Sequence, residues 1–446
     1  MPKLNHSELT RLFLLACSLF VLASCGDSSD PPAPADIIDD GSDDGSGGGS
    51  GDDPGDTSNA PQGVFVVSGD GDGTEVQNTI SWELDPDATE YTVYWDNVPG
   101  VTDASSVVVP AFEGSRYVVH AGAEVLAGST YYYRVQATVG DVASALSGEV
   151  SGTPQLAATG NQLNDVAWNG ADTLVAVGDS GVILASPNAT VDGWTDVSTE
   201  AAPQQLTGVT WEGINSQFLV VGAGNTVLTG DGTTWAKQDL GNLAAASNLQ
   251  DVAWLGDGYI AVGNNSAIIT SNIDGSAWVS QDPGADVPNT SFNAAAYSGE
   301  TIVVVGSNGT ILTSVDAITW ELQPALVNND LNDITWDGSQ FIAVGSNDAV
   351  LTSPDGLTWA AHIPGTSDIN FVAVTQWDSG LPAVPVVGVV GSAGTFVLGP
   401  ENDPGVIVRT GTTEQFGGMT WVDGGEGSAY FVIVGNDGTV MTAQAD

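Results

Sequence analysis

Positively charged side chains are scarce in this chain. Of its 446 residues only 6 are Lys or Arg, against 55 Asp or Glu, and the formal net charge is −49. Proteins that bind nucleic acid need clustered Lys and Arg to neutralise phosphates, so the composition excludes nucleic acid as a partner. The same excess of negative charge disfavours direct binding to anionic lipid headgroups.

Cysteine and histidine are almost as rare. The two cysteines, Cys17 and Cys25, both lie near the N-terminus, so the remaining chain has no thiol for a disulfide, a metal site or a nucleophile. Beyond the N-terminus there are two histidines, His120 and His362, far apart in the sequence. A histidine metal centre or a Ser-His-Asp triad is therefore disfavoured, and we expect no bound metal and no cofactor.

Apolar, aromatic and glycine residues are plentiful. The sequence is 42% hydrophobic and contains 57 Gly and 13 Trp, enough to bury a sizeable core. Because residues that favour helices are few and β-branched and aromatic residues are many, the composition predicts an all-β protein.

The first residues have the pattern of a secretory signal peptide. Lys3 and Arg11 precede an apolar run over 12–23, which is too short to span a bilayer. The run ends in Leu22-Ala23-Ser24-Cys25-Gly26, which resembles a bacterial lipobox. The resemblance implies removal of residues 1–24 and lipidation of Cys25. It further implies a protein anchored by lipid in the outer membrane, on the periplasmic face or the cell surface. An ordinary secreted protein is the alternative.

Residues 25–60 are almost entirely Asp, Gly, Ser, Pro, Thr and Ala, without periodicity. Such a segment is typical of an extended, disordered tether. Its Asp runs lack the ligand spacing of an EF-hand loop, and calcium binding is the alternative interpretation.

Residues 61–153 alternate polar and apolar residues in short segments, which predicts an antiparallel sandwich of about seven strands. Trp82 fits a core tryptophan of the second strand, and Tyr131, after Leu126 and Gly128, fits a tyrosine corner. With the exit Ser151-Gly152-Thr153-Pro154, the segment resembles a fibronectin type III domain.

Residues 154–446 contain a repeat. A strand ends in an aromatic residue at steps of 39 to 44 residues, a second ends in Val-Gly, a third is rich in Ile, Leu and Thr, and a fourth begins near a tryptophan. The first aromatic series is Trp168, Trp211, Trp254, Tyr297, Trp336, Trp377 and Trp421. Four strands at this period form one propeller blade, so seven copies predict a seven-bladed β-propeller.

The turn between the third and fourth strands has the form Asp-Gly-x-Thr-Trp. This turn resembles the Asp-box, or BNR, motif, and the whole repeat is similar to the propeller of the photosystem II assembly and stability factor family. We expect a structural role: the Asp accepts backbone amides and the Trp packs between blades. The residues concerned are Asp231, Asp274, Asp316 and Asp355, with Trp235, Trp278, Trp320 and Trp359.

The last repeat stops at Asp446 before a fourth strand. We expect residues near Gln155–Gly160 to supply that strand and to close the ring between the first and last blades.

Asp boxes also occur on the propellers of some enzymes. Sialidases need three arginines, and after residue 154 the chain has only Arg409 and Lys237 beside its many acids, so sialidase activity is excluded. A glycosidase with two carboxylates needs only a suitably spaced pair, and Glu212 and Glu321 are the non-repeated candidates. The recurring acids Asp165, Asp251 and Asp333 are better interpreted as structural, in a turn or an inter-blade hydrogen bond.

No catalytic residue is assigned, and a non-catalytic binding or scaffolding module of the cell envelope is the favoured function. The propeller would be a recognition head for a protein or glycan, with the sandwich as a spacer and the protein as a monomer. Alternatives are a carbohydrate-active enzyme and an assembly-factor-like chaperone. The assembly-factor family is thought to use an arginine-rich surface, which this composition cannot provide, so the resemblance carries the fold rather than the photosystem role.

Overall fold

The computed structural model describes the chain from residue 60 to 445, apart from several short segments. Those segments are 62, 71–75, 83–84, 112–116, 156, 188–192, 201–203, 242, 244–247, 363–368, 378–385, 401–405, 410–414 and 424–428. The signal peptide, Cys25 and the tether up to residue 59 therefore lie outside the described residues. Within these residues, no helix has the length and apolar character needed to cross a membrane.

The chain is all-β. Eight strands precede residue 153 and form two antiparallel layers, one of β1, β2 and β5 and one of β4, β3, β6 and β7, with β8 paired to β6. The strands are β1 (Phe65–Asp70), β2 (Val76–Ser81), β3 (Glu90–Asp96), β4 (Ser106–Ala111), β5 (Tyr117–Ala121), β6 (Tyr131–Val139), β7 (Val142–Leu146) and β8 (Val150–Gly152).

The core of these two layers follows from alternation along the strands. In β6, Tyr131, Tyr133 and Val135 point inward, and they pack with the fully buried Trp82. The hydroxyl of Tyr131 accepts the amide of Leu126 at 2.9 Å and donates to the carbonyl of Glu124 at 2.7 Å. These bonds tie the β5–β6 connection to β6, the arrangement expected of a tyrosine corner.

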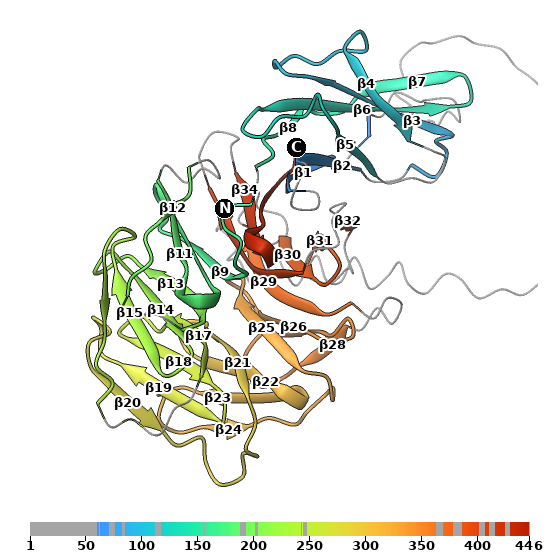
Figure 1. Cartoon of the computed structure of the whole chain (residues 1–446). Helices are drawn as coiled ribbons and strands as arrows, with labels where there is room; N and C mark the ends of the chain where they lie inside the picture. The colour runs from blue at the N-terminus through green and yellow to red at the C-terminus, as the bar shows by residue number, and fades with distance from the viewer. Residues whose placement is uncertain are drawn as a thin grey trace, which may run out of the picture. The chain divides into compact units, whose positions relative to one another are not determined.

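The remaining strands form sheets whose first strands lie side by side in a ring (Figure 1). Each first strand contacts the first strand of the next sheet, and β33 contacts β9, so the ring is closed. The sheets are β9 (Leu163–Trp168), β10 (Thr173–Gly178), β11 (Ile183–Pro187) and β12 (Thr195–Asp196); β13 (Leu206–Glu212), β14 (Gln217–Gly222), β15 (Thr226–Gly230) and β16 (Trp235–Lys237); β17 (Leu249–Trp254), β18 (Tyr259–Gly263), β19 (Ala267–Ser271) and β20 (Trp278–Gln281); β21 (Phe292–Tyr297), β22 (Ile302–Gly306), β23 (Thr310–Ser314) and β24 (Glu321–Leu322); β25 (Leu331–Trp336), β26 (Phe341–Gly345), β27 (Val350–Ser353) and β28 (Ala360–His362); β29 (Phe371–Trp377), β30 (Val386–Gly391), β31 (Thr395–Pro400) and β32 (Val406–Arg409); and finally β33 (Phe416–Val422), β34 (Tyr430–Gly435) and β35 (Val440–Ala445). Three short 3₁₀ turns, η1 (Asp179–Gly181), η2 (Ser307–Gly309) and η3 (Asn436–Gly438), complete the described elements.

The second strand of each sheet is apolar over nearly its whole length because both of its faces are covered by neighbouring sheets. In β18, Tyr259 and Ala261 belong to the core shared with the preceding sheet, whereas Ile260 and Val262 belong to the core shared with the following one. A strand buried on both faces has no reason to alternate. This explains the runs before each Val-Gly.

The glycine that ends each second strand lies opposite the start of the first strand, where the first strand has a β-bulge. At Gly345, for example, a Cβ would come within 2.0 Å of the carbonyl oxygen of Asp330. The recurring glycine is therefore a steric requirement of the bulge.

One member of the aromatic series, Trp377, ends its strand as expected but is offset in register from the others. In β25, the fourth residue pair after the bulge is Trp336 with Phe341. The fourth pair after the bulge in β29 is Gln376 with Val387, so Gln376 is the residue equivalent to Trp336. Trp377, the last residue of β29, lies one residue further on and pairs with Val386. The sequence comparison aligned the repeats by their aromatic residues, whereas the register of each first strand is determined by its bulge.

The expected closing strand was also wrong. β35 pairs with β1, so the outer strand of the last sheet comes from Phe65–Asp70 rather than from Gln155–Gly160. Of the latter segment, Ala158 donates its amide to the carbonyl of Gly438 at 2.9 Å, and the described part forms no strand. The edge of β35 is occupied by β1, whose Phe65, Val66 and Val67 are larger apolar residues than the alanines of Gln155–Gly160.

Candidate binding site at the mouth of the central channel

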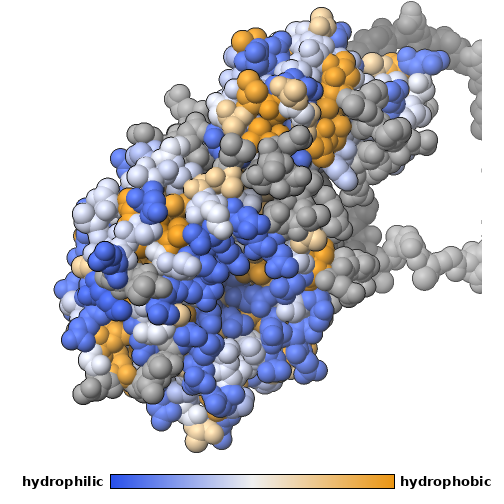
Figure 2. Space-filling view, viewed as in Figure 1, coloured by the Kyte–Doolittle hydropathy of each residue, from blue (hydrophilic) through white to orange (hydrophobic). Residues whose placement is uncertain are grey.

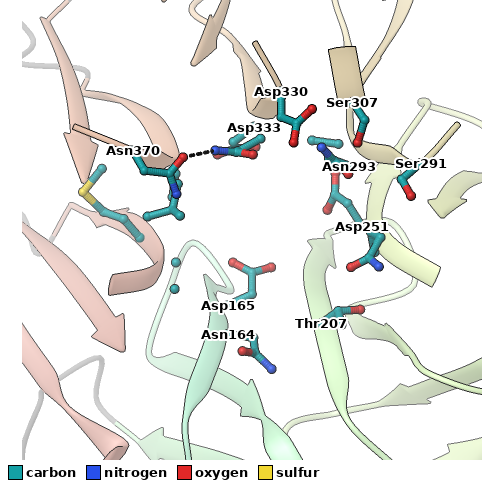
Figure 3. Close-up of a pocket in the computed structure, with 18 of the residues that line it drawn as sticks. Asn164, Asp165, Thr207, Asp251, Ser291, Asn293, Ser307, Asp330, Asp333 and Asn370 are labelled. Carbon is teal, nitrogen blue, oxygen red and sulfur yellow. Dashed lines mark hydrogen bonds between the residues drawn. The ribbon is translucent and has the colours of Figure 1, made fainter. Parts of the chain in front are cut away.

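A pocket of about 550 Å³ lies where the first strands of the ring begin. Its wall comes from the bulges of these strands and from the turns after the second strands, and it is mostly polar. Figure 2 shows the corresponding hydrophilic hollow, and Figure 3 shows Asp165, Asp251 and Asp333 around the opening. Among the residues that the structure describes, no Lys or Arg lines the pocket, and its only ionisable side chains are aspartates.

Three aspartates of the wall join alternate pairs of sheets. Asp165 accepts its neighbour's amide, Val166, with one carboxylate oxygen and the amide of Val209 in the next sheet with the other, both at 2.8 Å. Asp333 does the same with Ile334 and Val374, both at 2.7 Å. The structural interpretation of these recurring acids is thereby confirmed.

Asp251 completes the set by accepting the amide of Ala295 at 3.0 Å. Burial raises the pKa of all three carboxyls, and mutual repulsion adds to the rise for Asp165 and Asp333. The pKa of Asp333 is raised to about 7 by burial and by the nearby Asp251. The backbone amides act in the opposite direction because they favour the carboxylate form.

At four of the bulges, the residue just before this position makes a second bond between sheets. Asn164, Asn293 and Asn332 each donate the side-chain amide to the first-strand carbonyl of the next sheet, at 2.6 to 2.7 Å. Thr207 donates its hydroxyl to the carbonyl of Leu249 at 2.8 Å in the same way. The sequence analysis missed these residues; a polar residue directly after the Leu or Phe that begins the strand was the available signal.

The wall changes character in the last two sheets. The equivalent positions there hold Val372, Ala373, Gly417 and Gly418, followed by Met419, and all five line the pocket. The mouth therefore has a polar arc from the first five sheets and an apolar or glycine arc from the last two. Such a surface can contact a ligand that carries both apolar and hydrogen-bonding groups.

The Asp-box residues lie away from this pocket, and none of them lines it. Asp355 accepts the amides of Leu357 and Thr358 at 2.8 and 2.7 Å, and Asp231 and Asp316 make the same pair of bonds in their turns. Asp274 accepts the amide of Ser276 at 3.0 Å. Hydrogen bonds from the turn backbone and hydroxyls lower the pKa of these carboxyls, to about 2 for Asp231.

The tryptophans that follow pack between sheets. Trp235, Trp278, Trp320 and Trp359 each belong to a core formed by their own sheet and the preceding one. The indole of Trp278 and that of Trp359 also donate to the carbonyl of the glycine three residues earlier, at 2.7 and 2.8 Å.

The non-repeated acids do not form a catalytic pair in the pocket. Glu212 is 1% exposed, and its carboxylate accepts the backbone amides of Ile214 and Asn215 in a turn. Glu321 is exposed on the outer strand β24, and neither acid lines the pocket.

The two histidines are also apart. His120 is buried in the sandwich beside Tyr133, while His362 is on β28 and pairs with the hydroxyl of Thr352 at 3.0 Å. Among the residues that the structure describes, no group of three or more His, Cys, Asp or Glu side chains is arranged to hold a metal ion.

A closed ring of antiparallel sheets around a polar channel defines a β-propeller, and comparison with solved structures agrees. YCF48 bound to a D1 peptide superposes with a TM-score of 0.52 at 13% identity, covering 65% of this chain and 94% of that one. YCF48 from Cyanidioschyzon merolae gives 0.51 at 13% identity, with 64% and 97% covered. The WD40 propeller of Doa1 gives 0.51 at 10% identity, with 64% and 93% covered.

No protein-family model and no curated sequence matches this chain. At these identities the structural likeness shows the fold alone. The resemblance to a propeller of the photosystem II assembly-factor type is supported at that level.

Proposed function

We propose that this chain is a non-catalytic protein-binding module whose propeller holds its partner at the mouth of the central channel. The observation that carries the proposal is the pocket of about 550 Å³, with a polar arc and an apolar arc and no basic side chain. A structural neighbour, YCF48, is known with a bound D1 peptide, which supports peptide binding as a use of this fold.

Charge indicates the kind of partner. The described wall holds the exposed Asp330 and no Lys or Arg, and the net charge of the chain is −49, so a neutral or basic protein segment is favoured over an acidic one. A recognition head with these features fits a seven-bladed propeller that follows a fibronectin type III-like sandwich, which is the architecture we propose for the whole chain.

The test is binding of candidate partner proteins, and of synthetic basic and acidic peptides, to the lipid-free chain with Asp330→Lys. Asp330 lies at the mouth, where its carboxylate accepts the amide of Asn308 at 2.8 Å. Asp257→Lys makes the same charge change at an exposed turn that does not line the pocket. We expect at least a tenfold loss of affinity for a basic ligand with the first variant only. Equal loss in both would refute the channel mouth as the site.

A carbohydrate-active enzyme is the rival function. A polysaccharide hydrolysis screen with the same preparation separates the two. Turnover of any glycan that is lost on replacing one pair of acids would overturn the binding proposal, whereas binding without turnover supports it.

For location, we propose a lipid-anchored protein of the outer membrane, on the basis of the lipobox-like sequence that ends in Cys25. Cys25→Ala should move the protein from the membrane fraction to the soluble fraction of the cell. Membrane partition that does not change would refute the lipid anchor.

A further inference from the structure

Strand β1 is hydrogen-bonded along both edges, to a sandwich strand on one side and to a propeller strand on the other. Phe65, Val66 and Val67 pair with Ser81, Ile80 and Thr79 of β2. The same three residues pair with Ala445, Gln444 and Ala443 of β35. A single antiparallel sheet therefore runs from β33 through β34, β35 and β1 to β2 and β5.

The side chains of this strand divide between two cores. Val64 and Val66 pack in the sandwich core, while Phe65 and Val67 pack in the core of the last propeller sheets. All four are at most 5% exposed. The ring of Phe65 lies edge-on to that of Phe396 in β31, with centroids 6.5 Å apart. Val64 to Val67 are consecutive apolar residues, without the usual alternation with polar ones, because both faces of the strand are buried.

The fit around the strand is close. A Cβ on Gly69 would lie 2.5 Å from Cγ of Met441, and the hydroxyl of Ser151 donates to the side-chain oxygen of Gln444 at 3.1 Å. β1 has six residues, whereas the outer strands of the other propeller sheets have two to four. Four of its residues, Phe65 to Ser68, pair with β35, which equals the longest pairing of an outer strand in the other sheets.

We propose that the sandwich is the closing element of the propeller rather than a spacer. It presents β1 as a preformed edge on which β35, the last of the described strands, pairs in register. Sandwich and propeller then unfold as one cooperative unit, and their association does not depend on the covalent connection through residues 153–162.

The first test cuts that connection in the folded protein. A site-specific protease sequence is inserted after Gln155 in the full chain, the protein is cleaved, and the product is analysed by size exclusion under native conditions. We expect both fragments to elute together at the size of the uncut chain. Separation of the fragments in native buffer would overturn the proposal.

Two charge variants of the cleavable protein show which contact holds the fragments. Val67→Lys places a cation in the core of the last sheets and should release the fragments from each other. Val107→Lys makes the same change at a residue of β4 that is 50% exposed and should leave them together. If the fragments of the Val67→Lys variant remain together, the contacts of β1 with the last propeller sheets do not hold sandwich and propeller together.

A milder variant covers the case in which Val67→Lys does not fold. Phe65→Ala is made in the uncut chain, and hydrogen–deuterium exchange is followed by mass spectrometry. Peptides from β34 and β35 should exchange at least tenfold faster than in the unmodified protein, while Val107→Ala should not change them. Unchanged exchange in β34 and β35 with Phe65→Ala would refute the role of β1 as the closing strand.

Discussion

Among single residues, the buried aspartates of the channel have the clearest physical signature. Asp333 is fully engaged with two backbone amides, yet burial and the neighbouring Asp251 raise its pKa to about 7. In the unfolded chain the same carboxyl titrates near its usual value of 3.8. The folded protein therefore holds this proton more tightly between those two values, and the stability that Asp333 contributes falls as the pH rises through that range.

Asp333→Asn should remove that dependence. Relative to the unmodified protein, we expect the variant to gain about 3 kcal/mol of unfolding free energy between about pH 4.5 and about pH 7.5. Urea denaturation at the two pH values measures the difference, with the exposed Asp257→Asn as control. A difference between Asp333→Asn and the unmodified protein that does not change with pH would contradict the raised pKa.

The Asp-box carboxylates have the opposite character, because they are exposed and their pKa is lowered. Asp355→Ala removes the acceptor for two turn amides, which should cost about 1 kcal/mol and lower Tm by about 2–4 °C. Asp355→Asn keeps one acceptor oxygen and should remain within about 1 °C of the unmodified protein. Scanning calorimetry compares the three, and equal loss in both variants would argue against the backbone bonds as the cause.

At the scale of elements, the seam between the last and first sheets depends on glycine. A Cβ on Gly418 would lie 2.6 Å from Cα of Asp165 and 2.8 Å from its carboxylate, because β33 and β9 approach closely there. Most of the other sheet junctions are joined by side-chain hydrogen bonds. The junction between β33 and β9 is instead formed by close contact of the two backbones.

Gly418→Ala should therefore destabilise the protein by about 1–3 kcal/mol through overpacking. Gly213→Ala serves as control, since its Cβ would meet nothing within 4 Å. Chemical denaturation of both variants gives the comparison. If Gly418→Ala is as stable as the control, β33 and β9 can move apart enough to accommodate the added Cβ, and the overpacking prediction is wrong.

At the scale of the whole molecule, the net charge of −49 is a source of self-repulsion. Salt shortens the screening length from about 10 Å at 0.1 M to about 3 Å at 1 M, so added NaCl should stabilise the compact state. We expect Tm to rise by several degrees between about 0.05 M and about 1 M NaCl. A Tm that is indifferent to NaCl over this range would refute the electrostatic explanation.

Local sequence determined the repeat, the all-β class and the turn chemistry. Tight turns, the glycine opposite each bulge and strands buried on both faces impose constraints within a few residues, so they leave a pattern such as Asp355-Gly356-Leu357-Thr358-Trp359 that can be read directly. The inter-blade role of Asp165, Asp251 and Asp333 could be inferred because it recurs at the same place in the repeat.

Only the tertiary structure decided how the ring is completed. Phe65 and Ala445 lie at opposite ends of the described chain, and pairing between such distant strands leaves no local signature, so Gln155–Gly160 was the nearer but wrong choice. In β29, Gln376 rather than Trp377 is equivalent to the aromatic residues of the other first strands. This register, and the convergence of Asn164, Asn293 and Asn332 on the channel, depend on a bulge that adds one residue to the strand. The sequence specified the blades one at a time, because each is a local unit, whereas the channel and its closing strand exist only once the sheets are packed together.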